Sequence, residues 1–590
     1  MNQAKEEAEL KFKEAEGEIL QKEKELKDLT LGKWYILNRY DNPGFQSFED
    51  DAERIDRIAS IFPLFFLIVA ALVCLTTMTR MIEEQRTQIG TLKAIGYKDK
   101  RIVAKYFFYA LAAALGGSIL GIILGLAFLP KLIFNAYHAL YMLPNFNVHF
   151  SWGIVAIAIF SALLCTCTVT LVVAYREFRT TPATLMRPKA PKKGKRIFLE
   201  KVPFVWNRLN FTSKVTARNI LRYKSRFIMT ILGVAGCTAL ILAAYGLKDS
   251  ISVVVPRQYG EIFTFDSMMN LKYEGTLPEK SNIKAILNQD KDFESNMLVD
   301  QRIMKGSKEN GNNEIEIRMF VPEKTNLLPS YVTLKDAKNK DDIQFTSESV
   351  VITNKFAKLL GVSVGDTINI FDDNMELHLK VTDIAENYVY NYVYISPELY
   401  KDKVGDEAVF NTVLSKFIDE AKNNQEAVAE RWLKNYDVLS VVFTSSVIDN
   451  FNNIIASLNR VVAVMIICAA ALAFVVLYNL TNINVAERLR EIATIKVLGF
   501  TDKESANYVY RENIVLSVIG ILLGLIVGIF LSYFIVSSVE MDIVMFGREI
   551  KAMSFLYASG LTIIFTLFVN LVMYRRINNI SMVESLKSIE

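Results

Sequence analysis

The chain contains seven apolar runs that are each long enough to cross a membrane. They lie near residues 58–79, 106–129, 152–174, 227–247, 461–481, 514–536 and 553–573. A bilayer core about 30 Å thick needs about 20 apolar residues in a helix. The alternative, that some of these runs are buried helices of a soluble protein, is strongly disfavoured at this length. The pattern therefore predicts an α-helical polytopic membrane protein with seven spans.

A short motif occurs twice, and each copy precedes a span that contains regularly spaced glycines. The copies are "IGTLKAIGYKDK" at residues 89–100 and "IATIKVLGFTDK" at residues 492–503. Continued in the same register without a gap, Gly117, Gly121 and Gly125 align with Gly520, Gly524 and Gly528. A repeat of this kind indicates a duplicated structural unit, and glycines four residues apart let another helix approach closely. We therefore expect two related membrane halves and predict a helix-packing role for these six glycines.

The apolar positions of the motif recur at a spacing of three residues. They are Ile89, Leu92 and Ile95 in the first copy, and Ile492, Ile495 and Leu498 in the second. This spacing places them on one face of a short helix, beside Lys93 or Lys496. Such an amphipathic helix can lie on a lipid surface or occupy a groove of a partner protein. Periodicity alone slightly favours the lipid surface.

Orientation follows from the Lys and Arg residues of the loops, which are enriched on the cytoplasmic side. The loops after the first and third spans are the basic ones, with Arg80, Arg86, Lys93, Lys98, Lys100 and Arg101 in the first and Arg187, Lys189, Lys192, Lys193, Lys195 and Arg196 in the second. Both copies of the motif and the C-terminus are then cytoplasmic, and the region between spans four and five is extracellular. We expect a multi-pass protein of the cell membrane.

These patterns divide the chain into six predicted segments. They are an extracellular charged helix, the remnant of a coiled-coil arm, with a linker (1–57); a first membrane half of three spans (58–186); a basic cytoplasmic linker (187–216); an amphipathic lead-in helix with span four (217–249); an extracellular α+β domain (250–455); and a second membrane half of three spans (456–590). For the N-terminal helix, a coiled coil and a single solvated helix are equally supported. Span four has no counterpart in the first half, so we expect a further span upstream of residue 1.

The extracellular domain is predicted to be mixed α and β. β-Branched or alternating runs predict strands at 315–321, 349–353, 367–371, 377–384, 388–396 and 439–445, and helical patterns cover 354–361 and 419–437. Gly361 is expected to end the first of these helices. This length and pattern are typical of a folded domain rather than a linker.

Composition adds no sign of catalysis. The chain has 590 residues, of which 52% are hydrophobic, and a net charge of +4 that resides mainly in the predicted cytoplasmic loops. All five cysteines lie in predicted spans, which excludes an extracellular disulfide framework. The sequence contains no phosphate-binding loop, no histidine pair at metal-ligand spacing and no recognisable nucleophile motif. We expect no catalytic, cofactor-binding or metal-binding residue, no cofactor, and no nucleic-acid partner.

Four stretches together resemble a known family. They are "EEQRTQIGTLKAIGYKDK" with "GGSILGIILG", "AERLREIATIKVLGFTDK" with "IGILLGLIVG", "ARNILRYKSRFIMTILGV", and "LLGVSVGDTINI" in the extracellular domain. They resemble the FtsX-like permeases, which are membrane subunits of ABC transporters that include the macrolide exporter MacB and the lipoprotein-releasing complex. The chain resembles the duplicated form of this family, without the first span and most of the first extracellular domain.

The resemblance implies a mechanism in which this subunit is not itself an enzyme. A separate cytoplasmic ABC ATPase, acting as a dimer, would push on the two motifs and so move the extracellular domains, for export or release of a lipophilic or peptide substrate. The implied docking residues are Ile89, Leu92, Lys93, Ile95 and Gly96 in the first motif and Ile492, Ile495, Lys496, Leu498 and Gly499 in the second. Two ATPase subunits would need two docking helices, which accounts for the repeat.

A second hypothesis comes from a different functional class. The chain could be a membrane sensor or scaffold whose extracellular domain and helical arm control an extracellular protein partner, such as a cell-wall enzyme. An ATPase that copurifies in stoichiometric amount distinguishes the two hypotheses, because it favours the permease.

Overall fold

The computed structural model describes residues 42–138, 145–147, 150–186 and 224–578, apart from short gaps at 277–279, 310, 312, 373–374, 436, 488 and 541, together with a few isolated residues. The chain divides into two compact units, Met1–Arg57 and Ile58–Glu590. The predicted coiled-coil arm, most of the basic linker and most of the lead-in helix lie outside the described residues.

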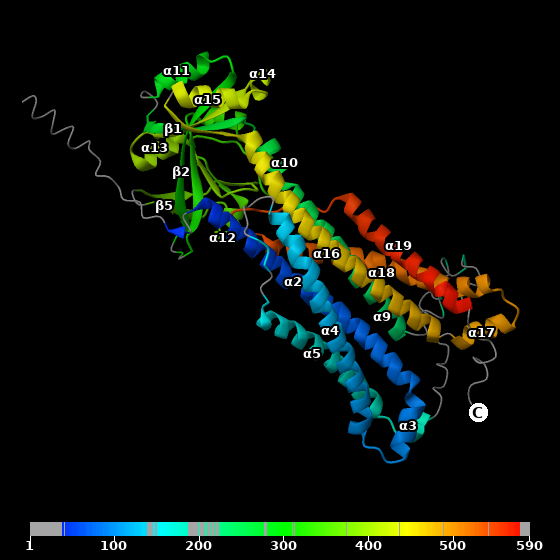
Figure 1. The fold of residues 1–590 in the computed structure, drawn as a ribbon. Helices are drawn as coiled ribbons and strands as arrows, with labels where there is room; N and C mark the ends of the chain where they lie inside the picture. The colour runs from blue at the N-terminus through cyan, green and yellow to red at the C-terminus, as the bar shows by residue number, and fades with distance from the viewer. Residues whose placement is uncertain are drawn as a thin grey trace, which may run out of the picture. The chain divides into compact units, whose positions relative to one another are not determined.

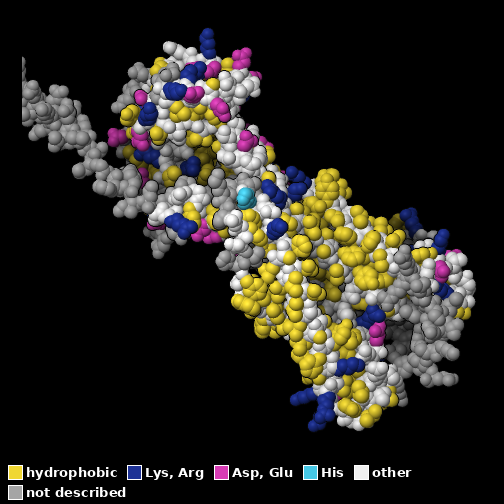
Figure 2. All heavy atoms as spheres, viewed as in Figure 1, with side chains coloured by type: hydrophobic (Ala, Val, Ile, Leu, Met, Phe, Trp, Pro, Cys, Tyr) yellow, Lys and Arg dark blue, Asp and Glu magenta, His cyan; other side chains and the backbone are white. Residues whose placement is uncertain are grey.

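Seven helices in the described part of the chain are long and apolar enough to cross a membrane. They are α2 (Pro43–Glu84), α4 (Asp99–Tyr137), α5 (Trp152–Phe178), α9 (Lys224–Ser252), α16 (Thr444–Glu487), α18 (Asp502–Val539) and α19 (Ala552–Asn578). Apolar side chains cover the surface of these helices, whereas charged side chains gather over the sheet domain and at the opposite helix ends (Figure 2). The seven predicted spans are therefore present, and the fold class is the one expected from the sequence.

Short helices connect the long ones. The motif copies form α3 (Arg86–Ala94) and α17 (Leu489–Val497), and α6 (Pro182–Met186) follows α5. After α9 the chain passes through α10 (Val254–Pro256) and η3 (Arg257–Ile262) into the sheet domain. As Figure 1 shows, α3 and α17 lie at the end of the helices that is remote from the sheet domain.

The sheet domain contains ten strands and corresponds to the predicted α+β domain. The strands are β1 (Ser267–Gly275), β2 (Phe293–Lys308), β3 (Ile315–Pro322), β4 (Val350–Thr353), β5 (Thr367–Phe371), β6 (Glu376–Lys380), β7 (Asp383–Ala385), β8 (Tyr392–Ile395), β9 (Phe410–Phe417) and β10 (Val438–Phe443). Their order is β10-β1-β9-β2-β3-β8-β4-β7, with β5 between β2 and β6. The β3–β8 and β4–β7 pairs are parallel and the others antiparallel.

The helices of the sheet domain are α11 (Ser281–Gln289), η4 (Thr325–Ser330), α12 (Asn354–Leu360), α13 (Pro397–Val404), α14 (Asp419–Lys422) and α15 (Gln425–Asn435). Each predicted strand and helix of this domain overlaps an observed one, but the predicted strand 377–384 is divided into β6 and β7, and the predicted helix 419–437 into α14 and α15. Gly361 ends α12 with a left-handed φ of 63°. The sequence patterns missed β1, β2 and β9. These strands carry polar residues among their apolar ones, and they are held by pairing with one another across the centre of the sheet.

A buried ion pair lies on the central strand β2. The Asp300 side chain is fully buried, and it accepts hydrogen bonds from Arg302 Nε at 2.8 Å and Nη2 at 3.0 Å. Burial nevertheless raises the pKa of Asp300 to about 6, because the loss of hydration outweighs the attraction of the guanidinium. The sheet domain therefore carries an acid that opposes folding when it is ionised.

This ion pair predicts a pH dependence of stability. A folded-state pKa raised above the unfolded value gives stability that is present at low pH and lost as the pH rises through the folded value. Between pH 5 and pH 7 the free energy of unfolding should fall by about 1 kcal/mol from this group. Denaturant unfolding of the full chain in detergent, followed through the fluorescence of tryptophan, measures this change. In the Asp300→Asn variant, the change in the free energy of unfolding between pH 5 and pH 7 should be smaller by about 1 kcal/mol. An unchanged pH dependence would contradict the raised pKa of Asp300.

Candidate functional site

The two motif copies fold into the same structure, a short helix followed by a tight turn into a long helix. In the first copy, the backbone N–H of Gly96 donates to Lys93 O at 3.1 Å and that of Tyr97 donates to Leu92 O at 3.0 Å. In the second copy the same two hydrogen bonds run from Gly499 and Phe500, at 3.0 and 3.3 Å, to the carbonyls of Lys496 and Ile495. This is the Schellman pattern of helix termination. We call the two structures the motif turns.

The glycine of each motif turn is required by the backbone. Gly96 has a φ of 98° and Gly499 a φ of 94°. Side chains with a Cβ rarely adopt this left-handed conformation, whereas glycine does so at little cost. Gly96 and Gly499, which the family resemblance grouped with the docking residues, therefore end the short helix and direct the chain into α4 or α18.

A lysine fastens each motif turn to the rest of its membrane half. Lys93 Nζ donates to the carbonyl of Phe178, the last residue of α5, at 2.7 Å, and lies 3.1 Å from Asp99 Oδ1. Lys496 Nζ donates to the carbonyl of Asn578, the last residue of α19, at 3.3 Å, and lies 2.9 Å from Asp502 Oδ1. A cation at a helix C-terminus satisfies unpaired carbonyls and the helix dipole. Both lysines therefore serve as internal anchors.

The first isoleucine of each motif is also directed inward. Ile89 is 2% exposed and packs in a cluster with Ile82, Ile102 and Leu185. Ile492 is 0% exposed and packs with Val485. The resemblance implied that Ile89 and Ile492 would contact a partner protein. In the structure, both side chains are covered by the chain's own helices. Leu92 and Ile495 are half-buried.

The exposed part of each motif turn is apolar. Ile95 is 71% exposed and Tyr97 is 50% exposed; the corresponding residues of the second copy, Leu498 and Phe500, are 72% and 52% exposed. Each pair is held on a backbone that the lysine and the glycine fix in place. The sequence pattern identified Ile95 and Leu498 but missed Tyr97 and Phe500, although an aromatic residue after the glycine in both copies was a usable signal.

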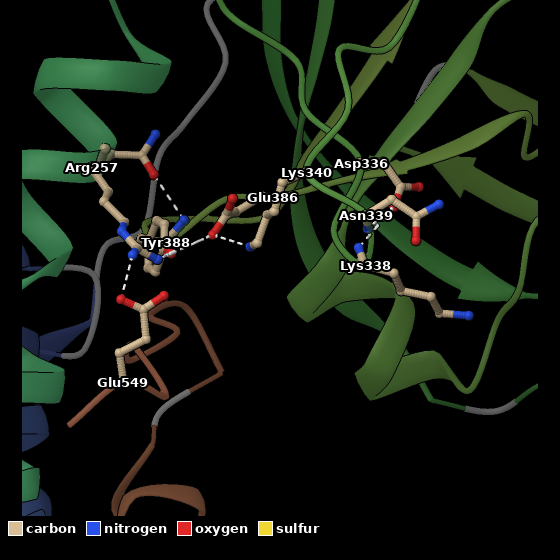
Figure 3. A network of polar contacts seen from close by, with 9 residues as sticks. Arg257, Asp336, Lys338, Asn339, Lys340, Glu386, Tyr388 and Glu549 are labelled. Atoms are coloured by element: carbon tan, nitrogen blue, oxygen red, sulfur yellow. Dashed lines mark hydrogen bonds and ion pairs between the residues drawn. The ribbon is translucent and has the colours of Figure 1, made fainter.

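At the other end of the helices, three segments meet beside the sheet domain: η3, the chain between β7 and β8, and residues 540–551 between α18 and α19. Arg257 of η3 donates to Glu549 at 2.7 Å and to the Tyr388 hydroxyl at 2.6 Å, and Figure 3 shows its side chain between the two. The hydrogen bond from Arg257 lowers the pKa of Glu549. Glu386 accepts from Tyr388 and lies 2.6 Å from Lys340 Nζ. This network joins η3, the sheet domain and the α18–α19 connection.

Backbone contacts reinforce this junction. The N–H of Tyr390 donates to Ile543 O at 2.7 Å, and the N–H of Met545 donates to Tyr388 O at 2.8 Å. The α18–α19 connection thus pairs with the sheet domain in the manner of a short β-bridge. Because hydrogen bonds weaken steeply away from their preferred distance and angle, these two hold the α18–α19 connection in register with the chain between β7 and β8.

A buried charge cluster completes the junction. Glu540, at the end of α18, has a side chain only 2% exposed; it lies 2.9 Å from Arg548 Nη2 and 3.2 Å from Lys355 Nζ of α12. Burial lowers the pKa of Lys355, and the nearby Glu540 partly opposes this effect. Removal of one partner of such a pair leaves an uncompensated buried charge. The contact therefore ties the end of α18 to the sheet domain.

Comparison with known proteins finds one family model that matches the chain twice. The FtsX-like permease C-terminal domain matches residues 60–182 and again residues 463–582. The two matches begin 403 residues apart, which is also the separation of Gly117 from Gly520. The chain carries two FtsX-like permease domains. Each of these domains contains one motif turn and three of the long helices, so the duplication inferred from the motif is confirmed.

Two solved structures are similar, at low sequence identity, to about a third of the chain. The periplasmic region of MacB from Actinobacillus actinomycetemcomitans is 11% identical and covers 34% of this chain and 98% of its own, with a TM-score of 0.22. The extracellular domain of the noncanonic ABC-type transporter YknZ from Gram-positive bacteria is 11% identical and covers 30% and 99%, with a TM-score of 0.22. No curated protein sequence matches the chain.

The different burial of the motif residues predicts different effects of the same substitution. Ile89→Asp places a carboxylate in an apolar cluster without a partner, which costs several kcal/mol. Ile95→Asp places it in solvent and should leave the unfolding temperature of the detergent-solubilised protein unchanged. We expect Ile89→Asp to lower that temperature by several degrees or to prevent accumulation of folded protein. Equal unfolding temperatures for the two variants would contradict the observed burial.

Proposed function

We propose that this chain is the membrane subunit of an ABC transporter and that a separate cytoplasmic ATPase binds to its two motif turns. The observation that supports this most strongly is the matched pair of exposed apolar side chains, Ile95 with Tyr97 and Leu498 with Phe500. Solvent-exposed apolar side chains on a fixed backbone are typical of protein interfaces. Two equivalent turns on one chain suit the two subunits of an ATPase dimer.

The geometry also supports transmission of force from the motif turns to the sheet domain. Helix α16 begins at Thr444, directly after β10, and runs for 44 residues without interruption to Glu487, just before α17. At about 1.5 Å per residue it spans about 66 Å. A displacement of the second motif turn would therefore reach the sheet domain along a single helix, as Figure 1 illustrates.

The junction beside the sheet domain would distribute this displacement. The Arg257–Glu549 contact joins η3 to the α18–α19 connection, and the buried Glu540–Lys355 pair joins the end of α18 to the sheet domain. In the proposed mechanism, closure of the ATPase dimer moves the motif turns, and the sheet domain on the extracellular side changes position to export or release a lipophilic or peptide substrate. The protein's own residues transmit force and carry out no bond chemistry.

If the ATPase docks on Ile95 and Leu498, a negative charge at these two positions should prevent its binding. The double variant Ile95→Asp with Leu498→Asp should remove at least nine-tenths of the copurifying ATPase, because two carboxylates would have to be desolvated in apolar grooves. Each single variant should retain more, since one turn still tethers the ATPase. Pull-down from membranes with an affinity tag on this chain measures the amount bound.

The control is Lys100→Asp with Lys503→Asp, which places carboxylates at equivalent exposed positions in the first turn of α4 and α18, outside the motif helices. This control should bind ATPase as the wild type does. Normal copurification by the Ile95→Asp, Leu498→Asp variant, at wild-type membrane levels, would remove the docking role and favour a lipid-facing motif.

The proposed orientation is tested by chemical labelling. In a background without the five native cysteines, a cysteine at the exposed Asn339 of the sheet domain should react with a membrane-impermeant thiol reagent on intact cells, whereas one at the exposed Lys98 should react only after permeabilisation. Both reactivities are read by mass shift of the purified protein. The reverse pattern would place the sheet domain in the cytoplasm and overturn the proposal.

A further inference from the structure

Two residues other than glycine have a positive φ in the described part of the chain, Lys340 at 65° and Tyr390 at 62°. For a side chain with a Cβ this left-handed conformation is unfavourable, because the Cβ comes close to the following carbonyl oxygen. A bulky residue such as tyrosine adopts it rarely. Both residues lie at the junction beside the sheet domain, where Lys340 pairs with Glu386 (Figure 3) and Tyr390 bonds to Ile543. The junction therefore contains strained backbone.

A buried amide side chain holds the strained segment in place. We call residues 387–390, between β7 and β8, the latch. Gln258 is 0% exposed, and its Oε1 accepts hydrogen bonds from the backbone N–H groups of Tyr388, at 2.8 Å, and Val389, at 3.1 Å. Its Nε2 donates to Asn387 Oδ1 at 3.0 Å. Gln258 thus uses both ends of its amide group on the latch.

A second buried amide completes the grip on Tyr390. The Asn387 side chain is 2% exposed, and its Nδ2 donates to the carbonyls of Val389 and Tyr390, each at 2.8 Å. The guanidinium of Arg318 lies 3.8 Å from the centre of the Tyr390 ring. A strained residue persists only where its surroundings over-determine its conformation. Here the two amides and the Arg318 contact do so.

In this conformation the latch holds the α18–α19 connection. The N–H of Tyr390 donates to Ile543 O, and Tyr388 O accepts from the N–H of Met545. Soon after Tyr390 the chain enters β8, which is fixed in the sheet between β3 and β4. A return of Tyr390 to negative φ would therefore swing the latch and not β8, and would turn the Tyr390 N–H away from Ile543. Relief of the strain and release of the connection are the same movement.

Gln258 connects the latch to the membrane helices. It belongs to η3, which is a π-helix, a rare element that occurs frequently at functional sites. Helix α9 leads directly through α10 into η3, so a displacement of α9 moves Gln258. The neighbouring Arg257 bonds to the Tyr388 hydroxyl, so two successive residues of η3 contact the latch.

We propose that Gln258 is a positioning residue that keeps the latch in its strained, closed state. A shift of α9 that withdraws Gln258 removes its hydrogen bonds to Asn387, Tyr388 and Val389 together. The strain at Tyr390 then favours opening, and the α18–α19 connection separates from the sheet domain. An element with two such states is what a conformational switch requires. The switch lies in the path of the proposed function but does not depend on ATPase docking at the motif turns, so either can fail without the other.

Hydrogen exchange of the full chain in lipid nanodiscs measures the opening of the latch, because the amides of Tyr390 and Met545 are protected in the closed state. Gln258→Leu keeps the bulk of the side chain without its hydrogen bonds and should speed exchange of both amides at least tenfold. The amide of Leu414, in a strand paired on both sides, reports global unfolding and should keep its wild-type rate. Unchanged exchange of Tyr390 and Met545 would overturn the proposal.

A pair of substitutions at Tyr390 separates stored strain from ordinary packing. Tyr390→Ala removes the ring and keeps the Cβ, whereas Tyr390→Gly removes the strain as well. The Met545 amide should exchange about fivefold more slowly in the glycine variant than in the alanine variant. In a loop without strain, glycine would favour opening, so equal or faster exchange in the glycine variant would overturn the proposal. The same pair at the exposed Lys338, whose φ is not positive, should leave Met545 exchange unchanged.

The control of the latch by α9 is tested from within the membrane. A Cβ at Gly528 would lie 3.0 Å from Leu242 Cβ and 3.2 Å from Ala239 Cα, so Gly528→Val should displace α9. We expect Met545 exchange to become at least fivefold faster. Phe530→Val, at a position that is 72% exposed on the same helix, should have no effect. A wild-type rate in the Gly528→Val variant would contradict the control of the latch by α9.

Discussion

The close packing of α9 against Gly520, Gly524 and Gly528 of α18 is the contact on which the rest of the structure depends. Helix α9 is the most buried of the long helices, with 72% of its apolar window covered. Its end continues into η3 and the first strand of the sheet domain, and the end of α18 carries Glu540, which pairs with Lys355 of that domain. Glycine at positions 520, 524 and 528 lets α9 and α18 approach closely, and both helices lead directly into the junction.

At the helix ends remote from the sheet domain, the same polar contacts are made twice, once in each membrane half. Lys93 and Lys496 each neutralise the C-terminus of the last helix in their half and contact an aspartate of the next helix. With the helix-ending glycine, this leaves each motif turn little freedom to move independently. Force applied to a turn would be transferred to the long helices and not absorbed locally. Because the two motif turns have the same geometry, one chain can offer two equivalent attachment points.

Several elements of this account could be predicted from residues alone because their signals are local. The seven spans follow from apolar length, the duplication from a gapless register, and the end of α12 from Gly361. The orientation of the motif helix could not be predicted, because an apolar stripe at Ile89, Leu92 and Ile95 does not show which of these residues the chain itself buries. Burial of Ile89 depends on Ile102 and Leu185, which are distant in sequence or on other helices. In the same way, identical glycine spacing could not reveal that Gly520, Gly524 and Gly528 contact α9, whereas Gly117, Gly121 and Gly125 have no close contact among the described residues.

The central claim, that one chain offers two equivalent docking turns, is tested most directly by the stoichiometry of the complex. The measurement is the mass of the intact complex released from native membranes, determined by native mass spectrometry in the presence of a nonhydrolysable ATP analogue. The account predicts two ATPase subunits for each copy of this chain. A complex with one ATPase subunit per chain, or a chain that carries none, would contradict it.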